Sequence, residues 1–406
     1  MTRLDSQPWM SARSTRKLMK ALGEARFVGG AIRNTLLGKS VSDIDIATPL
    51  TPDKVGTLLA AAGIHFVPTG IEHGTVTAIV DGKPFEVTTL RRDVTTDGRH
   101  AVVAFTDDWR LDAQRRDFTM NALYADASGE VFDFVGGIED LKAGRVRFVG
   151  DAAKRICEDY LRILRLFRFH AWYGKGGIDA QALRAAAAEK DGIAGLSGER
   201  IAKEMLRLLE AENPAPVLRP MAASGILAEV LPGEADVARL ESLAKIDAAS
   251  PFAPDALLRL AALLPHDKTL AGQVAGRWKL PNEARARLAD IAGADEKIAP
   301  DLSGREARKL LYRLGVRPFK DRVLLKWAAD AKAAVSWRAL LALADAWERP
   351  RFPLSGRDVM LAGVPQGPLV GQVLGEVEEW WIDSDFTGDS SSLAERLKTA
   401  VRAVAR

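Results

Sequence analysis

The chain has 406 residues, with 57 lysines and arginines against 54 aspartates and glutamates, so its formal net charge is only +3. A surface for nucleic acid would therefore come from local basic clusters rather than from an overall excess of positive charge. The single cysteine, Cys157, excludes an intrachain disulfide and a cysteine-based zinc site, and favours a reducing cytoplasm. No apolar run approaches the roughly 20 residues that span a membrane, and residues 1–10 lack a signal-peptide core. We expect a soluble cytoplasmic protein of roughly two to four domains, with no membrane partner and no obligate protein partner.

The first notable stretch is 28-VGGAIRNTLLGKSVSDIDIATP-49. Gly29 and Gly30 follow a short predicted strand and precede a helix predicted over residues 31–37. Backbone N–H groups at such a helix start can bind phosphate, and glycine lets the phosphate approach closely. Two glycines alone are a weak signal, but the acidic residues that follow strengthen it.

Asp43 and Asp45 flank a single isoleucine in this stretch. Residues 44–47 favour a strand, so alternation sends both aspartates to the same face. Two carboxylates on one face repel each other unless a cation lies between them, and Mg²⁺ with substrate phosphates is the usual solution. An isolated Asp-x-Asp is more often a solvated loop, but the glycines before it favour a metal site here.

This stretch resembles the first motif of the nucleotidyltransferase superfamily, in detail that of class II tRNA nucleotidyltransferases and bacterial poly(A) polymerases. The matching residues are Gly29, Gly30, Arg33, Leu36, Leu37, Gly38, Asp43, Asp45 and Thr48. Asn34 stands where many members have aspartate, at a position that is not a metal ligand in the family. The resemblance implies two Mg²⁺ ions held by Asp43 and Asp45. It also assigns Gly29, Gly30 and Arg33 to nucleotide binding.

A hairpin is predicted next, because 75-TVTAIV-80 and 84-PFEVTT-89 flank the turn Asp81-Gly82. Glu86 projects opposite to its apolar neighbours and becomes a third carboxylate near the metal if its strand lies beside 44–47. An exposed glutamate on a half-buried strand is an equally good interpretation of the sequence. In related enzymes a carboxylate on this strand completes the acidic cluster, which favours a catalytic role. Further strands are expected at 27–28, 101–105, 131–135 and 145–149.

The run 115-RRDFTMNAL-123 predicts a helix start, where Asp117 and Asn121 would share a face at a spacing of four. A simple helix-capping role for Asp117 is the alternative. The run resembles the family's ribose-binding motif, which implies nucleotide contacts by Arg116, Asp117 and Asn121. The preceding run, 91-RRDVTTDGRHAVV-103, resembles the family's mobile loop, with matches at Asp93, Gly98 and Arg99.

A long amphipathic helix is predicted over 153–174, with Asp159, Arg162 and Arg165 at intervals of three on one side. An intrahelical salt bridge is the ordinary interpretation of such spacing. The segment resembles the family helix whose side chains select the incoming base. A carboxylate beside a guanidinium fits the pairing edges of cytosine and adenine and opposes those of guanine and uracil. The run 198-GERIAKEMLRLL-209 resembles the motif that braces this helix.

Residues 305–326 hold eight lysines and arginines against two acids. We expect Arg308, Lys309 and Arg313 to contact RNA phosphates, although a solvated helix face is nearly as good an interpretation. Residues 355–374 resemble the tail segment of class II CCA-adding enzymes. The pair His266-Asp267 lacks a partner helix rich in histidine and aspartate, which argues against a phosphohydrolase domain.

The predicted fold class is α+β, with an N-terminal α/β nucleotidyltransferase head followed by helices only. The predicted domains are a head (1–150), a neck with the base-selecting helix (151–212), a body (213–350) and a tail that contacts tRNA (351–406). The resemblance implies CCA addition to tRNA from CTP and ATP. A poly(A) polymerase, a CC-only or A-only enzyme of the same family, and a non-catalytic RNA-binding protein remain as alternatives. The chain ends without the long basic extension usual in poly(A) polymerases, and the intact aspartates argue against the non-catalytic protein.

Overall fold

The computed structural model describes residues 2–70, 74–97, 100–249, 253–294 and 297–404, except for the side chains of 93–103. The chain packs as two compact units: Met1–Ala235 with Gly276–Leu280, and Asp236–Ala275 with Pro281–Arg406. The finer division into head, neck, body and tail stays a prediction. Among the helices of the described ranges, none is long and apolar enough to cross a membrane.

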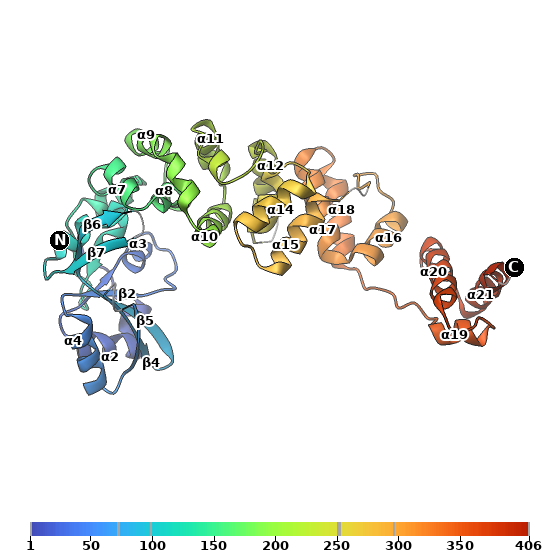
Figure 1. Ribbon diagram of the computed structural model, residues 1–406, viewed down its shortest axis with the longest axis horizontal. Coiled ribbons are helices and arrows are strands. Elements are labelled where there is room, and N and C mark those ends of the chain that lie inside the picture. The colour runs from blue at the N-terminus through green and yellow to red at the C-terminus, as the bar shows by residue number, and fades with distance from the viewer. Residues whose placement is uncertain (1, 71–73, 98–99, 250–252, 295–296, 405–406) are drawn as a thin grey trace. The chain divides into compact units, whose positions relative to one another are not determined.

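A seven-stranded sheet forms the centre of the first unit, with the strand order β3-β4-β5-β2-β1-β8-β9 (Figure 1). Its strands are β1 (Arg26–Val28), β2 (Asp45–Thr48), β3 (His65–Gly70), β4 (Thr75–Val80), β5 (Lys83–Thr89), β8 (Leu123–Ala125) and β9 (Val131–Asp133). Helices α2 (Arg13–Leu22) and α4 (Pro52–Ala61) pack against β4. Strand β2 is antiparallel to β1 and parallel to β5, so it lies in the middle of the sheet. This central position fixes the start of β2, where the paired aspartates lie.

The predicted hairpin of β4 and β5 is confirmed. Asp81 and Gly82 both have positive φ, 49° and 77°, as a two-residue hairpin turn requires. The segment that resembles the family's mobile loop, 91–103, forms most of a second hairpin, β6 (Arg91–Asp97) with β7 (His100–Phe105). The strand expected at 101–105 is therefore confirmed, and β-branched residues recur along both arms. Gly98 and Arg99 lie outside the described residues.

The strand expected at 145–149 is wrong. This segment pairs only with an irregular segment, where Thr119 N–H donates to Arg147 O and Val149 N–H donates to Asp117 O. These bonds form a single bridge, between Phe118 and Phe148, rather than a ladder. Strands β3 and β8, in contrast, were not expected from the sequence.

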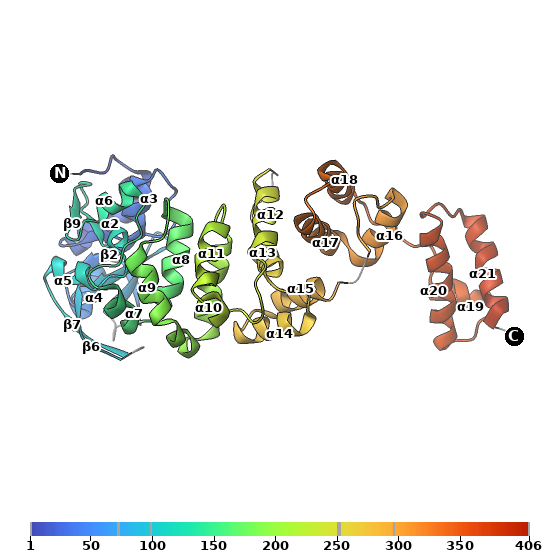
Figure 2. The same cartoon turned by 90° about the horizontal axis from the view of Figure 1, so that it is seen from above.

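The first unit also contains helices before the sheet strands in the chain, between them and after them. They are α1 (Pro8–Ser11), α3 (Gly30–Leu36), α5 (Trp109–Gln114), η2 (Thr119–Asn121), α6 (Gly137–Ala143), α7 (Ala152–Glu158), α8 (Leu161–Tyr173), α9 (Ala180–Ala188), η3 (Lys190–Gly195), α10 (Gly198–Leu209), α11 (Ala215–Ala223) and η4 (Leu227–Glu229). Helix α8 lies beside α10 and α11 (Figure 2).

The single helix expected over 153–174 is wrong, because the chain breaks between α7 and α8. Asp159 is extended, with φ −159° and ψ 104°, and its Oδ1 accepts a hydrogen bond from Leu161 N–H at 3.1 Å. An aspartate side chain that binds nearby backbone competes with the helical pattern. The break therefore falls on a residue predicted to select the base.

The second unit contains helices only within its described residues. They are α12 (Val237–Ala248), α13 (Ala256–Leu263), most of α14 (Lys268–Arg277), α15 (Asn282–Ala292), α16 (Gly304–Leu314), α17 (Val316–Ala329), α18 (Ala334–Asp345), α19 (Gly356–Leu361), α20 (Pro368–Asp383) and α21 (Ser390–Val404). Helices α20 and α21 lie side by side (Figure 2) and bury Val377, Trp381 and Leu397 in one apolar cluster. The predicted α+β class, a mixed head followed by helices, is confirmed.

Candidate active site

The three predicted catalytic carboxylates meet at one pocket. Asp45 opens β2 and lies directly opposite Glu86 in the parallel pairing with β5. Asp43 lies two residues before Asp45, and its Oδ2 accepts a hydrogen bond from Ser42 Oγ at 3.0 Å. All three carboxylates line a pocket of about 600 Å³. The condition under which Glu86 would join the two aspartates, that its strand lies beside 44–47, is met, whereas the catalytic roles stay predictions.

Carboxylates outnumber cations in this pocket, since Lys83 is the one basic residue among its described lining residues. Across the described ranges, none of Asp43, Asp45 and Glu86 forms an ion pair. Loss of water around Asp45 raises its pKa, the negative charges of Glu86 and Asp43 raise that pKa further, and Arg116 acts in the opposite direction. A cation would relieve this repulsion.

The donor set fits a hard divalent cation. Carboxylate oxygens are the ligands that such ions prefer, and Mg²⁺ takes only one or two protein carboxylates beside waters and phosphates. Within the described residues, no group of three Asp, Glu, His or Cys side chains forms a ready-made metal cluster. Asp43 and Asp45 would therefore hold a metal together with the substrate rather than as a closed protein cage.

Four of the predicted nucleotide-binding side chains form one hydrogen-bonded series. Arg33 Nη1 donates to Asn121 Oδ1 at 2.5 Å, and Asn121 Nδ2 donates to Asp117 Oδ1 at 3.0 Å. Asp117 Oδ2 accepts from Arg165 Nη2 at 2.5 Å. The structure therefore brings together residues from three separate segments of the sequence.

Asp117 is held as a carboxylate by this series. Burial alone would raise its pKa, but the charge of Arg165 and hydrogen bonds from Asn121, Arg165 and Phe118 N–H lower it to about 2. The helix expected to start here is wrong, since α5 ends at Gln114 and only the short η2 follows. Asp117 and Asn121 still meet, because η2 curls the chain back towards Asp117.

Two contacts of Arg33 were missed by the sequence reasoning. Its guanidinium lies 4.2 Å from the ring centroid of Tyr173, whose hydroxyl accepts from Arg33 Nη2 at 2.9 Å. Asn34 Oδ1 accepts from the same nitrogen at 3.0 Å. Burial lowers the pKa of Arg33. No sequence signal connects Tyr173 with the first motif, whereas the departure at Asn34 was visible.

A buried carboxylate, Asp112, organises the arginines of the 115–123 run. It accepts from Arg115 Nη2 at 2.7 Å, from Arg116 Nη2 at 2.9 Å and from Tyr124 Oη at 2.6 Å. Burial opposes ionisation, but these partners lower the pKa of Asp112 to about 2. The spacings of three and four before the two arginines were a sequence signal that could have found it.

The predicted base-selecting residues do not pair with each other. Asp159 Oδ2 accepts from Arg200 Nη2 of α10 at 2.7 Å. Arg162 Nη1 donates to Glu158 Oε2 at 2.6 Å, so this pair joins the end of α7 to α8 rather than lying within one helix. Asp159 and Arg162 are therefore not paired with each other, because Asp159 binds Arg200 and Arg162 binds Glu158.

Helix α10 contacts the base-selecting region as its motif predicted. Glu204 is 5% exposed and binds Arg168, and one of its oxygens lies 3.5 Å from Arg165 Nη1. Glu204 was not singled out by the sequence reasoning, although it lies inside the bracing motif. It extends the hydrogen-bonded series of Asp117 and Arg165 into α10.

Gly29, the first of the two glycines predicted to bind the nucleotide, uses its backbone N–H within the protein. Gly29 has φ 70°, a value that favours glycine, and its N–H donates to Leu123 O at 3.0 Å. Its amide is therefore used by the sheet, which leaves Gly30 as the candidate phosphate contact of the pair.

In the second unit, the predicted RNA-binding residues carry acidic partners. Arg308 binds Asp385 through Nε at 2.8 Å, Lys309 binds Asp383 and Arg313 binds Glu379. These acids belong to α20 and the residues just after it. No local pattern predicts these ion pairs, because the acids lie more than 60 residues along the chain, and the RNA contact stays a prediction.

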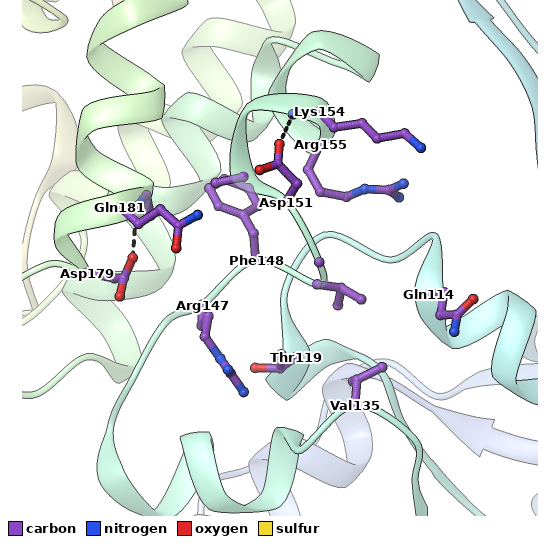
Figure 3. Close-up of a pocket in the computed structure, with 14 residues that line it drawn as sticks. Gln114, Thr119, Val135, Arg147, Phe148, Asp151, Lys154, Arg155, Asp179 and Gln181 are labelled. Atoms are coloured by element: carbon purple, nitrogen blue, oxygen red, sulfur yellow. Dashed lines mark hydrogen bonds between the residues drawn. The ribbon is translucent and has the colours of Figure 1, made fainter.

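A second pocket of the first unit, about 640 Å³ in volume, is lined by residues that include Arg147, Asp151 and Asp179 (Figure 3). Its two acids are engaged, since Asp151 caps α7 at Lys154 N–H and Asp179 caps α9 at Ala182 N–H, each at 2.8 Å. None of the predicted catalytic or nucleotide-binding residues lines it. We therefore place the chemistry in the carboxylate pocket.

A mixed sheet that carries paired carboxylates beside a glycine turn is typical of a nucleotidyltransferase head. A family model described as "Poly A polymerase head domain" matches residues 25–147, and one described as "Probable RNA and SrmB- binding site of polymerase A" matches 177–236. The chain is 35% identical over 389 residues to CCA tRNA nucleotidyltransferase 1, mitochondrial, of Mus musculus, covering 92% of this chain and 86% of the relative. It is 30% identical over 366 residues to the CCA-adding enzyme of Levilactobacillus brevis, covering 87% and 88%.

A solved structure agrees with these matches. The Bacillus stearothermophilus CCA-adding enzyme in complex with CTP has a TM-score of 0.78 and 27% identity, covering 98% of this chain and 99% of that one. The chain belongs to the family of CCA-adding tRNA nucleotidyltransferases, which confirms the resemblance found in the sequence. Enzymes of this family generally use divalent metal ions.

Proposed function

We propose that this protein adds C, C and A in turn to the 3′ end of tRNA, using CTP and ATP and no nucleic-acid template. The observation that carries the proposal is the register of β2 and β5, which sets Asp45 opposite Glu86 and gathers both with Asp43 at one pocket. The choice of tRNA, CTP and ATP as substrates rests on membership of the family.

Asp43 and Asp45 would hold two Mg²⁺ ions, with Glu86 as a third carboxylate beside them. When bound, the ions lower the pKa of the RNA 3′-hydroxyl and neutralise charge on the triphosphate. The protein's own part is to hold the three carboxylates together through the pairing of β2 with β5, so that both substrates meet at them. Pyrophosphate leaves as the RNA oxygen bonds to the α-phosphorus.

The nucleotide would lie against the series of Arg33, Asn121, Asp117 and Arg165, with Arg116 near the carboxylates. Asn121 and Asp117 offer hydrogen-bonding groups suited to sugar hydroxyls, and the arginines suit phosphate oxygens. Gly30, at the start of α3, adds a backbone amide. The arginines already hold protein partners, so binding would exchange some of these bonds for substrate contacts.

Base choice would lie with Asp159 and Arg162. Cytosine and adenine each show an amine donor beside a ring-nitrogen acceptor, which a carboxylate and a guanidinium satisfy together. In the structure the two side chains hold Arg200 and Glu158, so a base would take over these partners. Guanine or uracil would leave polar groups unpaired.

We also propose a cytoplasmic location, the four-part division into head, neck, body and tail, and tRNA contacts by the tail. A lone exposed cysteine, Cys157, suits a reducing compartment.

Sequencing the products formed from tRNA lacking CCA with all four nucleotides tests the proposal directly. Addition of CCA supports it. A long A tract, a CC or A end, or no addition would each contradict it and point to a poly(A) polymerase, a partial enzyme or an RNA-binding protein. Removal of metal by EDTA should stop addition, and Mg²⁺ should restore it.

A further inference from the structure

The carboxylate pocket has walls that the proposed nucleotide contacts leave unused. Besides Asp43, Asp45 and Glu86, the residues lining it include Trp9, Thr15, Thr77 and Lys83. None of the nucleotide group formed by Arg33, Asn121, Asp117 and Arg165 is among its described lining residues. The carboxylates therefore border a second space, distinct from that group, with a volume of about 600 Å³, which is enough for a nucleotide.

The reaction brings two substrates to the same carboxylates. If the triphosphate lies with the arginine series, the RNA 3′-hydroxyl must approach through space that those residues do not occupy. The pocket beside Asp45 and Glu86 meets that requirement.

Trp9 forms a fixed aromatic wall of this pocket. Its indole Nε1 donates to Thr35 Oγ1 at 3.1 Å, and its ring meets Phe27 edge-on with centroids 4.9 Å apart. Its backbone carbonyl accepts from Thr15 Oγ1 at 2.7 Å. The side chain remains half-buried, so part of a rigid aromatic surface is free for contact at low entropic cost.

Lys83 supplies the charge that an RNA end needs. It opens β5, three residues before Glu86, and is exposed. In the part of the chain that the structure describes, it has no acidic partner. An aromatic surface and a cation in one pocket are the elements with which proteins hold single-stranded RNA.

We propose that Trp9 and Lys83 form the subsite for the 3′-terminal nucleotide of the RNA, with Trp9 against its base and Lys83 at its phosphate. This inference rests on the proposed nucleotidyl transfer and names the residues that position the acceptor end. Aromatic contact with a base tolerates any sequence, which suits an end that changes after each addition.

The experiment pairs protein variants with altered RNA ends. Single-turnover addition of the first C is measured on tRNA lacking CCA, with its terminal nucleotide either intact or without its base. We expect Trp9→Leu to slow addition on intact RNA by about 5- to 150-fold, the range for loss of one stacked base. The same substitution should cost less than about 2-fold on the abasic RNA, because the contact is already missing there. Trp9→Phe should restore most of the rate on intact RNA.

A structural role of Trp9 predicts a different pattern. If Trp9→Leu slows both substrates by the same factor, the base contact is overturned. Thr35→Val is the matched control, since it removes only the acceptor of the indole N–H and should leave the difference between the two RNAs intact. Failure of the wild type to add CCA to intact tRNA would instead refute the proposed function, so the two failures are distinguishable.

Lys83 is tested by binding rather than by turnover. Lys83→Gln should weaken binding of tRNA lacking CCA a few-fold and reduce the slope of log affinity against log salt by about 1, with the KM for CTP unchanged. Lys54→Gln, at an exposed lysine of α4 outside the pocket, is the control and should change neither quantity. An unchanged salt slope for Lys83→Gln would overturn the phosphate contact.

Discussion

Two groups of charged side chains in the first unit differ in what neutralises them. Asp43, Asp45 and Glu86 share a pocket and, as far as the structure describes the chain, have no cationic partner. Asp117, in contrast, binds Arg165 at 2.5 Å and Asn121 at 3.0 Å. One carboxylate of each group shows the contrast, since the pKa of Asp45 is raised and that of Asp117 is lowered to about 2.

The difference indicates two kinds of binding. The carboxylate pocket carries repulsion that a cation would relieve. The arginine series is already satisfied, so a nucleotide must replace existing hydrogen bonds with its own. A correct ligand replaces these hydrogen bonds with equivalent ones, so the net gain in binding free energy is small. A wrong ligand leaves buried polar groups unpaired, which costs much more binding free energy.

The largest effect is expected from removing charge in the first group. Asp45→Asn should lower the rate of CTP addition by at least about 1,000-fold, because a metal ligand is lost without opening a cavity. The same variant should bind tRNA like the wild type and unfold at a similar temperature. Single-turnover addition in Mg²⁺ checks the rate. Asp53→Asn, an exposed aspartate of α4, is the control and should retain full activity. Near wild-type turnover by Asp45→Asn would refute the metal assignment.

Base selection is tested at Asp159, which lies outside both groups but, like Asp117, holds an arginine partner. Asp159→Ala should reduce the preference for CTP over UTP by roughly 10- to 100-fold and lower CTP use, because the acceptor for the base amine is lost. The metal site should be unaffected, so Mn²⁺ or Mg²⁺ dependence should not change. Competition between CTP and UTP on one tRNA measures the ratio.

A control separates base contact from loss of the observed ion pair. Arg200→Ala removes the partner of Asp159 but leaves its carboxylate. If both variants lose selectivity equally, the ion pair positions Asp159. Unchanged selectivity in Asp159→Ala would show that its role is structural only.

Local sequence patterns predicted those parts of the site that depend on residues close together in the chain. The strand over 44–47 and the hairpin at Asp81-Gly82 follow from alternation and turn chemistry. These patterns left open whether the two strands lie side by side, and the structure pairs Glu86 with Asp45. The resemblance to the family's motifs singled out Arg33, Asp117 and Asn121, and the fold brings these three side chains together.

Partners from distant segments could not be predicted. Arg200 lies 41 residues from Asp159, and Glu204 lies 36 residues from Arg168, so only the packing of α8 against α10 creates these pairs. The break at Asp159 was missed because helical periodicity continues across it, while a single side-chain bond to Leu161 N–H decides the local conformation.

A third prediction concerns the buried carboxylate Asp112, which resembles Asp117 in its partners. Its folded pKa of about 2 lies below the ordinary value of 3.8, so the unfolded chain binds more protons between these two values. The stabilisation is therefore complete above about pH 4 and is lost as pH falls towards 2. The shift corresponds to roughly 2 kcal/mol.

Urea unfolding at pH 7, 4 and 3 checks this sign. Asp112→Asn should be less stable than the wild type by about 2 to 3 kcal/mol at pH 7, and the difference should shrink at pH 3. Asp108→Asn is a matched control in the same helix, since asparagine caps α5 as well as aspartate does. A difference that grows as the pH falls would contradict the sign.

The smallest effect is expected for the basic residues of α16 in the second unit. Like Asp117, and unlike the carboxylates of the pocket, these residues have partners of opposite charge. Arg308, Lys309 and Arg313 each bind an acid of α20 or of the residues after it. Exposed ion pairs are weak, so RNA phosphates can compete with these acids. Replacing all three basic residues with glutamine should weaken tRNA binding by about 3- to 10-fold and flatten its salt dependence, with ATP affinity unchanged.

The acids provide the decisive comparison. If α16 contacts RNA, replacing Glu379, Asp383 and Asp385 with their amides frees the basic side chains and should strengthen tRNA binding by a few-fold. If the pairs only hold α16 to α20, both triple variants should lower stability and neither should change the salt slope. Filter binding of tRNA between 50 and 200 mM salt distinguishes the two, because the number of released counterions sets the slope. Stronger binding by the acid-to-amide variant would show that its acids normally screen an RNA surface, which a solvated helix face would not do.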